Sequence, residues 1–293
     1  MPIIDGRGIA RRRQEKLRRE VANLASKDII PTIARILVGE DSAASVYYRA
    51  KARLAEKLGI KFAGIELPEE THEKEVLDAI HKLNIDPQVD GIFVELPLSS
   101  HISRERIARA ISPEKDIDAI NPLSMGLMLV EGAGVAGYRQ LSEQCDVLLP
   151  ATPRAVMELL LESGVDLVGE EAVMIGRSLS VGRPLSLLLL TEGATVTICH
   201  SKTRSMEAIT KRADLLCVAV GRPRFLTADM VKRGAVVIDI GINVTPAGIV
   251  GDVDYEGVAG RASLITPVPG GVGPMTTTTM IMANVVKCAS SRQ

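Results

Sequence analysis

The chain of 293 residues lacks closely spaced cysteines, long apolar runs and an N-terminal leader pattern. Its four cysteines stand far apart and include no Cys-x-x-Cys pair, so neither a zinc site nor a disulfide framework is indicated. No apolar run approaches the length that spans a bilayer, and the first ten residues carry no signal-peptide pattern. We therefore expect a cytoplasmic protein with free thiols, no metal site and no membrane contact.

A strong charge of either sign is also absent, since the formal net charge is −1. A nucleic-acid partner held by bulk electrostatics usually requires a basic stripe, so no such partner is expected. The nearest candidate, residues 11–19, is interrupted by Glu15 and is better interpreted as a solvated helix face. The content of 46% hydrophobic and 24% charged residues is that of an ordinary globular protein, with length enough for two domains.

Strand and helix patterns alternate along the first half of the chain. After a helix-rich start over residues 1–30, the patterns predict strands over 33–38, 61–67 and 91–96 and helices over 41–58 and 71–83. Such alternation predicts right-handed crossovers and a parallel sheet. Residues 132–146, which begin Gly132-Ala-Gly134 and continue as a polar stretch, are predicted to link this half to the next.

The second half repeats the alternation, with strands expected over 172–175, 195–199, 214–220, 235–240 and 263–266 and helices between them. A helix is predicted from residue 152 to Gly164, and another over 275–290. The prolines and glycines of residues 267–274 exclude a helix or a central strand and predict a loop. This half is expected to be a doubly wound sheet.

The stretch Ala172–Pro184 is the centre of that half. Val173-Met174-Ile175 has the pattern of a buried strand, and Gly176 opens a turn into a helix that ends at Gly193. Backbone N–H groups and the helix dipole at such a turn favour an anion, usually a phosphate. The spacing Gly-x-Ser-x-x-x-Gly differs from Gly-x-Gly-x-x-Gly, so a dinucleotide site and an ordinary strand-to-helix connection both remain open.

The residues after the next predicted strand bear on the choice of cofactor. His200-Ser-Lys-Thr-Arg204 contains no acid, whereas an acid there would normally bind the ribose hydroxyl of NAD. Basic or hydroxyl-bearing residues favour the 2′-phosphate of NADP instead, and Arg177 supplies a further cation. NADP is therefore the predicted cofactor. The alternative interpretation of His200 is a loop histidine that binds no ligand.

Four residues of the first half are candidates for catalysis. Tyr47 and Lys51 are four residues apart and share a helix face. A partly buried lysine can exchange protons while a tyrosine ring stacks on a flat substrate; the alternative is a lysine that extends its ammonium to water. Glu95 ends its strand, where open α/β sheets place ligands. Asp118 lies in an acidic loop and has a turn residue as its alternative interpretation.

Taken together, these segments closely resemble the bifunctional methylenetetrahydrofolate dehydrogenase/cyclohydrolase family over nearly the whole chain. The residues that carry the resemblance are Val38-Gly39, Tyr47-x-x-x-Lys51, Asp90-Gly-Ile-Phe-Val94, Leu96-Pro-Leu98, Pro113-Glu-Lys-Asp-Ile-Asp118, Gly176-Arg-Ser178, Val181-Gly-Arg-Pro184, His200-Ser-Lys-Thr203, Ala213-Asp-Leu215, Val220-Gly221, Asp239-Ile-Gly-Ile-Asn243, Gly251-Asp-Val253 and Thr266-Pro-Val-Pro-Gly-Gly-Val-Gly-Pro-Met-Thr276. The last motif is long and ordered, which makes it highly specific.

The resemblance implies an α/β fold of two three-layer domains that flank a cleft, the second a Rossmann-type doubly wound parallel sheet. Residues 1–148 with the C-terminal helix 275–293 would form the folate-binding catalytic domain, and residues 149–274 the NADP-binding domain. A homodimer through the Rossmann domain is implied as well.

The implied reaction is the NADP-dependent oxidation of 5,10-methylenetetrahydrofolate, followed by hydrolysis to 10-formyltetrahydrofolate. By resemblance Lys51 is the catalytic lysine, Tyr47 stacks on the folate, and Asp118 binds the pterin edge. The expected catalytic residues are Lys51, Tyr47, Glu95 and Asp118. The expected cofactor-binding residues are Gly176, Arg177, Ser178, Val181, Gly182, Arg183, His200, Ser201, Gly221 and Ile242. The expected substrate-binding residues are Tyr47, Leu96, Pro97, Asp118, Pro269, Gly270, Gly271 and Val272.

Four residues depart from the family pattern. Glu95 stands where a glutamine usually precedes Leu-Pro-Leu, Ala44 where a serine is common, Ala119 where a glycine follows the second aspartate, and Ala151 where a cysteine is usual. The first three surround the folate in the family. The substrate half of the site is therefore altered, while the cofactor half is kept.

Glu95 has the clearest chemical consequence. A carboxylate about 4 Å from Lys51 would favour the ammonium with roughly 4 kcal/mol at an effective dielectric near 20, and a charged lysine is a poorer proton acceptor. We therefore expect hydrolysis to be weakened relative to hydride transfer, unless Glu95 is itself the general base. The alternatives are a dehydrogenase without hydrolytic activity, a relative acting on another one-carbon carrier pterin, and a nucleotide-sensing protein without catalysis.

Overall fold

The computed structural model describes residues 3–39, 42–95, 98–246 and 248–292, without the side chains of residues 42–48, 50 and 274–276. The chain divides into two compact units, which we name after their sheets. The three-stranded unit comprises Arg12–Met128, Asp146–Ala151 and Thr278–Gln293. The five-stranded unit comprises Met1–Arg11, Leu129–Cys145 and Thr152–Thr277. The domain boundaries expected from the sequence remain predictions.

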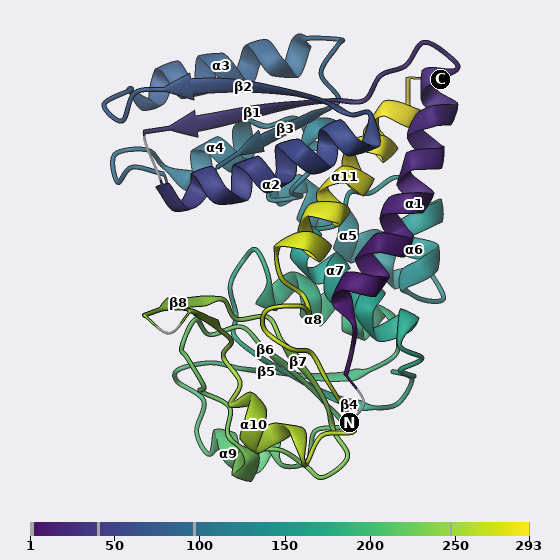
Figure 1. The fold of residues 1–293 in the computed structure, drawn as a ribbon, viewed down its shortest axis with the longest axis vertical. Helices are drawn as coiled ribbons and strands as arrows, with labels where there is room; N and C mark the ends of the chain where they lie inside the picture. The colour runs from purple at the N-terminus through teal and green to yellow at the C-terminus, as the bar shows by residue number, and fades with distance from the viewer. Residues whose placement is uncertain (1–2, 40–41, 96–97, 247, 293) are drawn as a thin grey trace. The chain divides into compact units, whose positions relative to one another are not determined.

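The sheet of the three-stranded unit has the order β2 (Lys61–Leu67), β1 (Thr32–Val38), β3 (Gly91–Val94), and its strands are parallel, as predicted. Because side chains alternate across a sheet, Ala34 and Ile36 share one face with Ile92. That face packs in one core with residues of α3 (Glu73–Ile85) and α4 (Arg104–Ala110). The helix α2 (Ser42–Leu58) runs alongside the sheet (Figure 1).

The C-terminal helix α11 (Pro274–Ser290) is held in this unit by a buried amide. Asn284 is fully buried, and its Nδ2 donates hydrogen bonds to the carbonyl oxygens of Ile117 at 2.7 Å and Leu149 at 2.9 Å. A buried amide bonded to two backbone carbonyls fixes the helix against two separate segments. The same unit contains most of α1 (Gly6–Ala25) and α5 (Pro122–Ala133), together with the short helix η1 (Pro113–Lys115).

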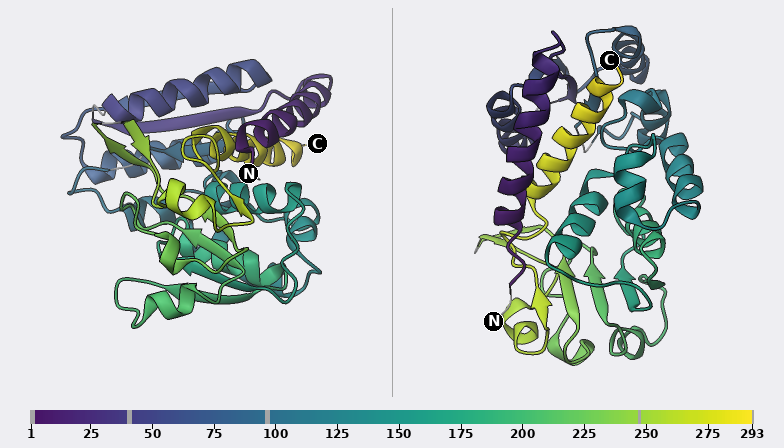
Figure 2. Two further views of the ribbon diagram at one scale, coloured as in Figure 1. Left: turned by 60° about the horizontal axis from the view of Figure 1, so that its bottom comes forward. Right: turned by 90° about the vertical axis from the view of Figure 1, so that its right-hand side faces the viewer.

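The five-stranded sheet is parallel throughout, in the order β10 (Leu264–Ile265), β7 (Val236–Asp239), β6 (Leu215–Val218), β4 (Glu171–Ile175), β5 (Thr195–Cys199). The chain steps from β4 to β5 on one side and then builds β6, β7 and β10 on the other, so the winding direction reverses between β4 and β6. Figures 1 and 2 show the unit that contains this sheet. This confirms the doubly wound sheet. Its helices include α7 (Ala151–Glu162), α8 (Gly182–Thr191), α9 (Met206–Thr210) and α10 (Tyr255–Ala259).

Two segments differ from the sequence expectation. Residues 132–146 are largely helical rather than an irregular link, because α5 extends to Ala133 and α6 spans Tyr138–Gln144. Tyr138 and Leu141 lie on one helix face and are buried, and the Tyr138 hydroxyl donates to Glu158 Oε1 at 2.9 Å. The helix expected between residues 220 and 235 is reduced to η2 (Ala228–Met230), because the backbone N–H of Leu226 bonds to Asp252 instead.

A small antiparallel hairpin, β8 (Asn243–Thr245) with β9 (Gly248–Val250), is an addition that the sequence patterns did not predict. Among the helices that the structure describes, none is both long and apolar enough to cross a membrane. All four cysteines are free, and Cys199 and Cys217 are buried in the five-stranded unit.

We predict that Asn284→Ala lowers the free energy of unfolding by about 2–3 kcal/mol, because it leaves two buried carbonyl oxygens without their donor. Ser290→Ala is the matched control on the same helix, since its exposed hydroxyl bonds only to the Val286 carbonyl of the preceding turn. Denaturant unfolding followed by circular dichroism measures both variants. Equal, small losses would show that the amide does not hold the helix.

Candidate functional site

A cluster of buried charged side chains lies on one face of the three-stranded sheet. The register places Arg35 of β1 opposite Phe93 of β3, and Glu95 follows Phe93 by two residues on the same face. Lys51 of α2 donates from Nζ to both Glu95 carboxylate oxygens at 3.0 Å, and Nζ lies 3.8 Å from the centre of the Phe93 ring. The Nε atom of Arg35 lies 3.5 Å from Glu95 Oε1. We call these four residues the Lys51 cluster.

Burial dominates the electrostatics of this cluster. The side chains of Arg35, Lys51 and Glu95 are only 2%, 11% and 6% exposed. Burial lowers the pKa of Lys51, and Arg35 lowers it further, while Glu95 and Asp118 raise it; the net direction is a lowered pKa. Burial likewise raises the pKa of Asp118, against the opposing effect of Lys51. Lys51 therefore releases its proton more readily than an exposed lysine does, although it is paired with a carboxylate.

The structure brings three of the four expected catalytic residues together. Lys51, Glu95 and Asp118 lie within electrostatic reach of one another. Tyr47 belongs to α2, one turn before Lys51, but its side chain lies outside the description, as do Leu96 and Pro97 entirely.

Ala119, the residue after Asp118, adopts a left-handed backbone with φ of 51° and is buried. An alanine is strained in this conformation, whereas a glycine is not, so the departure from the family pattern at this position has a conformational cost.

The five-stranded unit carries a glycine-lined loop after β4, next to the point where the winding reverses. Gly176 has φ of 127°, and a Cβ there would collide with the Ala219 carbonyl oxygen after β6. A Cβ on Gly182 would collide with the Gly176 carbonyl oxygen. The Ser178 hydroxyl accepts the N–H groups of Val181 and Gly182 at 3.2 Å, which shapes the entry to α8. A tight loop that leads into a helix N-terminus at a switch point fits a dinucleotide diphosphate.

Basic side chains surround this loop. Arg177 and Arg183 are exposed, and so are Lys202 and Arg204 after β5. The His200 N–H donates to Thr203 Oγ1 at 2.8 Å, and His200 Nδ1 accepts the N–H of Lys202 at 3.1 Å, so the segment is a tight turn. Exposed cations in a turn without an acid fit the additional phosphate of NADP.

Two aspartates that the sequence analysis left without a role organise the neighbouring loop. The buried Asp252 carboxylate accepts the backbone N–H groups of Val220, Gly221 and Arg222 at 2.6, 2.9 and 2.9 Å. Asp239 in turn accepts the backbone N–H of Asp252 at 2.9 Å, and burial raises the pKa of Asp239 to about 6. Both aspartates lie within sequence motifs, Asp239-Ile-Gly-Ile-Asn243 and Gly251-Asp-Val253, which were the available signal.

Close packing explains the glycines around these aspartates. A Cβ on Gly241 would collide with the Asp252 carboxylate, and a Cβ on Gly251 would collide with that of Asp239. Two expected cofactor-binding residues lie near these aspartates. Gly221 adopts a left-handed backbone with φ of 65°, and the side chain of Ile242 is 40% exposed.

The proline- and glycine-rich segment 267–274 is a loop up to Gly273, as predicted; α11 begins at Pro274. Pro269 is exposed and Gly270 has φ of 127°, while the Gly271 N–H donates to the Pro267 carbonyl at 2.8 Å. Val272 is buried, with only 3% of its surface exposed. The substrate-binding roles expected of these residues remain predictions.

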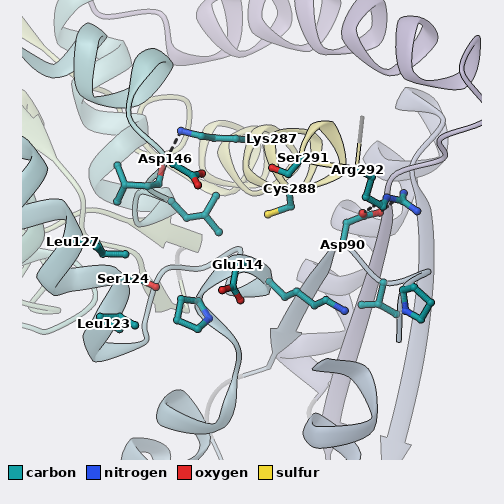
Figure 3. A pocket seen from close by; sticks show the side chains of 16 residues that line it. Asp90, Glu114, Leu123, Ser124, Leu127, Asp146, Lys287, Cys288, Ser291 and Arg292 are labelled. Atoms are coloured by element: carbon teal, nitrogen blue, oxygen red, sulfur yellow. Dashed lines mark hydrogen bonds and ion pairs between the residues drawn. The ribbon is translucent and has the colours of Figure 1, made fainter. Parts of the chain in front are cut away.

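A cavity of about 540 Å³ lies elsewhere in the three-stranded unit (Figure 3). Arg292, paired with Asp90, lies at one end of it and Lys287 at the other. None of its lining residues is among the expected site residues, so this cavity is separate from the Lys51 cluster. Over the described part of the chain, no group of three or more His, Cys, Asp or Glu side chains could hold a metal ion.

Fold and site define a class of α/β protein that combines a dinucleotide-binding sheet with a second unit carrying a buried lysine–carboxylate pair. Two family models match the chain: the tetrahydrofolate dehydrogenase/cyclohydrolase catalytic domain over residues 4–118, and the NAD(P)-binding domain of the same family over residues 150–293. The chain belongs to the tetrahydrofolate dehydrogenase/cyclohydrolase family, which confirms the resemblance found in its motifs.

Individual relatives match this chain over nearly their full length. The chain is 46% identical to the bifunctional protein FolD of Bacillus subtilis over 288 residues, which cover 98% of this chain and 97% of that protein. The crystal structure of the FolD enzyme of Campylobacter jejuni matches with a TM-score of 0.93 and 41% identity, covering 100% of both chains. The Trypanosoma brucei enzyme, solved with NADP cofactor and an inhibitor, matches with a TM-score of 0.90 and 33% identity over 100% of this chain and 99% of that one.

We predict that Asp252→Asn raises the dissociation constant for NADPH about tenfold, since an amide cannot accept three backbone N–H groups and the loop after β6 loses its support. Fluorescence titration with NADPH measures the change. Asp254→Asn, two residues further along, is the control; its side chain makes no capping hydrogen bond to α10. Unchanged affinity in a folded Asp252→Asn protein would separate the loop from cofactor binding.

Proposed function

We propose that the protein is an NADP-dependent 5,10-methylenetetrahydrofolate dehydrogenase that also hydrolyses its methenyl product to 10-formyltetrahydrofolate. The observation that carries this proposal is the state of Lys51: it is buried, its pKa is lowered, and its Nζ donates a hydrogen bond to Glu95. Membership of the family supports it, as do full-length relatives that are named bifunctional and one that was solved with NADP.

When bound, NADP⁺ supplies the acceptor for the hydride that leaves the methylene carbon of the substrate. The loop from Gly176 to Gly182 and the first turn of α8 would hold its diphosphate, and Arg177 with Lys202 would hold the 2′-phosphate. These roles explain why glycines, and no larger residues, occupy positions 176 and 182 of the loop. They also explain why cationic side chains are exposed beside it.

Loss of the hydride leaves a cationic methenyl carbon, which water attacks. The water oxygen bonds to this carbon while Lys51 accepts one proton, and the same proton passes to N5 as the bond from carbon to N5 breaks. The remaining hydroxyl proton leaves to solvent as the formyl group forms, so the step consumes one water and releases one proton. Lys51 must be neutral at the start, which its lowered pKa favours.

Glu95 acts on both steps in opposite directions. Its carboxylate favours the ammonium form of Lys51, which slows water attack, and the same charge stabilises the methenyl cation, which helps hydride transfer. We therefore propose that hydrolysis is weakened relative to oxidation, with a protein reduced to the dehydrogenase, or acting on another one-carbon carrier pterin, as the alternatives.

We predict that Glu95→Gln raises the rate of hydrolysis several-fold, because Lys51 then loses its proton more easily. The measurement is a first-turnover assay with 5,10-methylenetetrahydrofolate and NADP⁺ that follows NADPH and the methenyl compound separately. In the unaltered protein, methenyl compound should accumulate while NADPH forms.

Three other outcomes have distinct meanings. If no methenyl compound accumulates in the unaltered protein, hydrolysis is not weakened. If Glu95→Gln abolishes hydrolysis, Glu95 is the general base. If no folate yields NADPH, the proposed activity is wrong.

We propose further that the enzyme is a cytoplasmic homodimer joined through the five-stranded unit. β5 is one of the two edge strands of its sheet, and the apolar side chains of Val168, Leu190 and Ile198 are 71%, 57% and 40% exposed. An edge strand next to exposed apolar side chains favours pairing with a second copy. The free thiols fit a reducing compartment.

Ile198→Lys is expected to halve the mass that light scattering reports, since a charge at the edge strand opposes pairing. Ile85→Lys is the control, because Ile85 is 69% exposed in the other unit. A monomeric mass before substitution, or a dimer that survives Ile198→Lys, would contradict this interface.

A further inference from the structure

We propose that Arg35 is a positioning residue of the hydrolytic step: its guanidinium holds the Glu95 carboxylate in place and offsets the negative charge that Glu95 presents to Lys51. This inference rests on the proposed function and adds to it a residue that none of the sequence motifs contains. It comes from the placement of one arginine in the middle of a buried strand.

The position of Arg35 is unusual for its chemistry. It is the one charged residue of β1, Thr32–Val38, between the buried Ala34 and Ile36, and its own side chain is 2% exposed. A guanidinium stays protonated in proteins, and burying it is costly unless an anion faces it. Its placement in a core strand therefore calls for a compensating carboxylate.

Among the described residues, two carboxylates meet this guanidinium, and they differ in their surroundings. Arg35 Nε lies 3.5 Å from Glu95 Oε1, and Arg35 Nη1 lies 3.5 Å from Glu66 Oε1. The Glu66 side chain is 72% exposed, so water screens its charge, whereas the Glu95 side chain is 6% exposed. The strong electrostatic partner of Arg35 is therefore Glu95, the same group that Lys51 binds.

The charges that face Lys51 can be named element by element. Glu95 at the end of β3 and Asp118 after η1 are negative, Arg35 of β1 is positive, and the Phe93 ring packs against Nζ. Arg104 of α4 acts on Asp118. Glu95 contacts Nζ directly and has the larger effect on Lys51, and Arg35 reduces that effect while Glu95 remains the hydrogen-bond acceptor. Removing either member exposes Lys51 to the charge of the other.

The test is a double-mutant cycle of Arg35→Met, Glu95→Gln and the double variant. Competitive acetylation of Lys51 at a series of pH values, read by mass spectrometry, reports its proton loss without turnover, and the pH profile of hydrolysis reports it with turnover. We expect Arg35→Met to shift both midpoints about one unit to higher pH and Glu95→Gln to shift them to lower pH. The double variant should stay on the low-pH side, close to Glu95→Gln, because Arg35 acts on Lys51 chiefly through Glu95.

Two further variants separate positioning from stability. Arg35→Lys keeps the positive charge and should leave the midpoint unchanged. It also keeps the proposal testable if Arg35→Met does not fold. Arg292→Met removes another arginine of this unit, whose partner is the buried Asp90, and should lower stability without moving the Lys51 midpoint. If Arg35→Met behaves like Arg292→Met, or if the double variant keeps the shift of Arg35→Met, the inference is overturned.

The two proposals fail in different ways. If the unaltered protein forms no NADPH with any folate, the proposed function is wrong, yet the acetylation midpoints still report whether Arg35 offsets Glu95. If NADPH and formyl product both appear while the midpoints stay fixed across the cycle, the function stands and the role of Arg35 falls.

Discussion

A lysine buried against a carboxylate is the interaction on which the three-stranded unit depends. Burial lowers the pKa of Lys51, and a carboxylate holds the amine in one place. Both effects arise on a closed sheet face. The β1–β3 register supplies it by placing Arg35, Phe93 and Glu95 on one face, so the chemistry of the amine is set by strand pairing.

The five-stranded unit meets a different requirement, because its backbone has to approach an anion closely. Its loops after β4 and β6 are packed so tightly that Gly176 and Gly182 leave no room for a Cβ. Asp252 holds the second loop by accepting three successive N–H groups. A carboxylate fixes one loop, and the other leads into a helix N-terminus with the exposed Arg177 and Arg183 beside it, an arrangement that suits a phosphate.

The family pattern and the departures from it have separate physical meanings in this chain. The cofactor motifs keep the glycines that the loop geometry requires. The substrate side carries Glu95, which brings a charge to Lys51, and Ala119, which accepts a left-handed backbone with a Cβ. An arginine buried behind Glu95 makes the first departure tolerable, since a lone carboxylate in that place would be costly to bury.

The sequence by itself determined the alternation of strands and helices, the parallel doubly wound sheet and the family, because periodicity, glycine punctuation and ordered motifs are local. It also located Lys51, Glu95 and Asp118. It did not reveal the helix at Tyr138, the hairpin after Asn243, or the roles of Arg35 and Asp252. Those depend on which residues distant in the chain become neighbours: an arginine within a strand acquires a role only when strand pairing places a carboxylate beside it, and an aspartate only when a loop turns its N–H groups toward it.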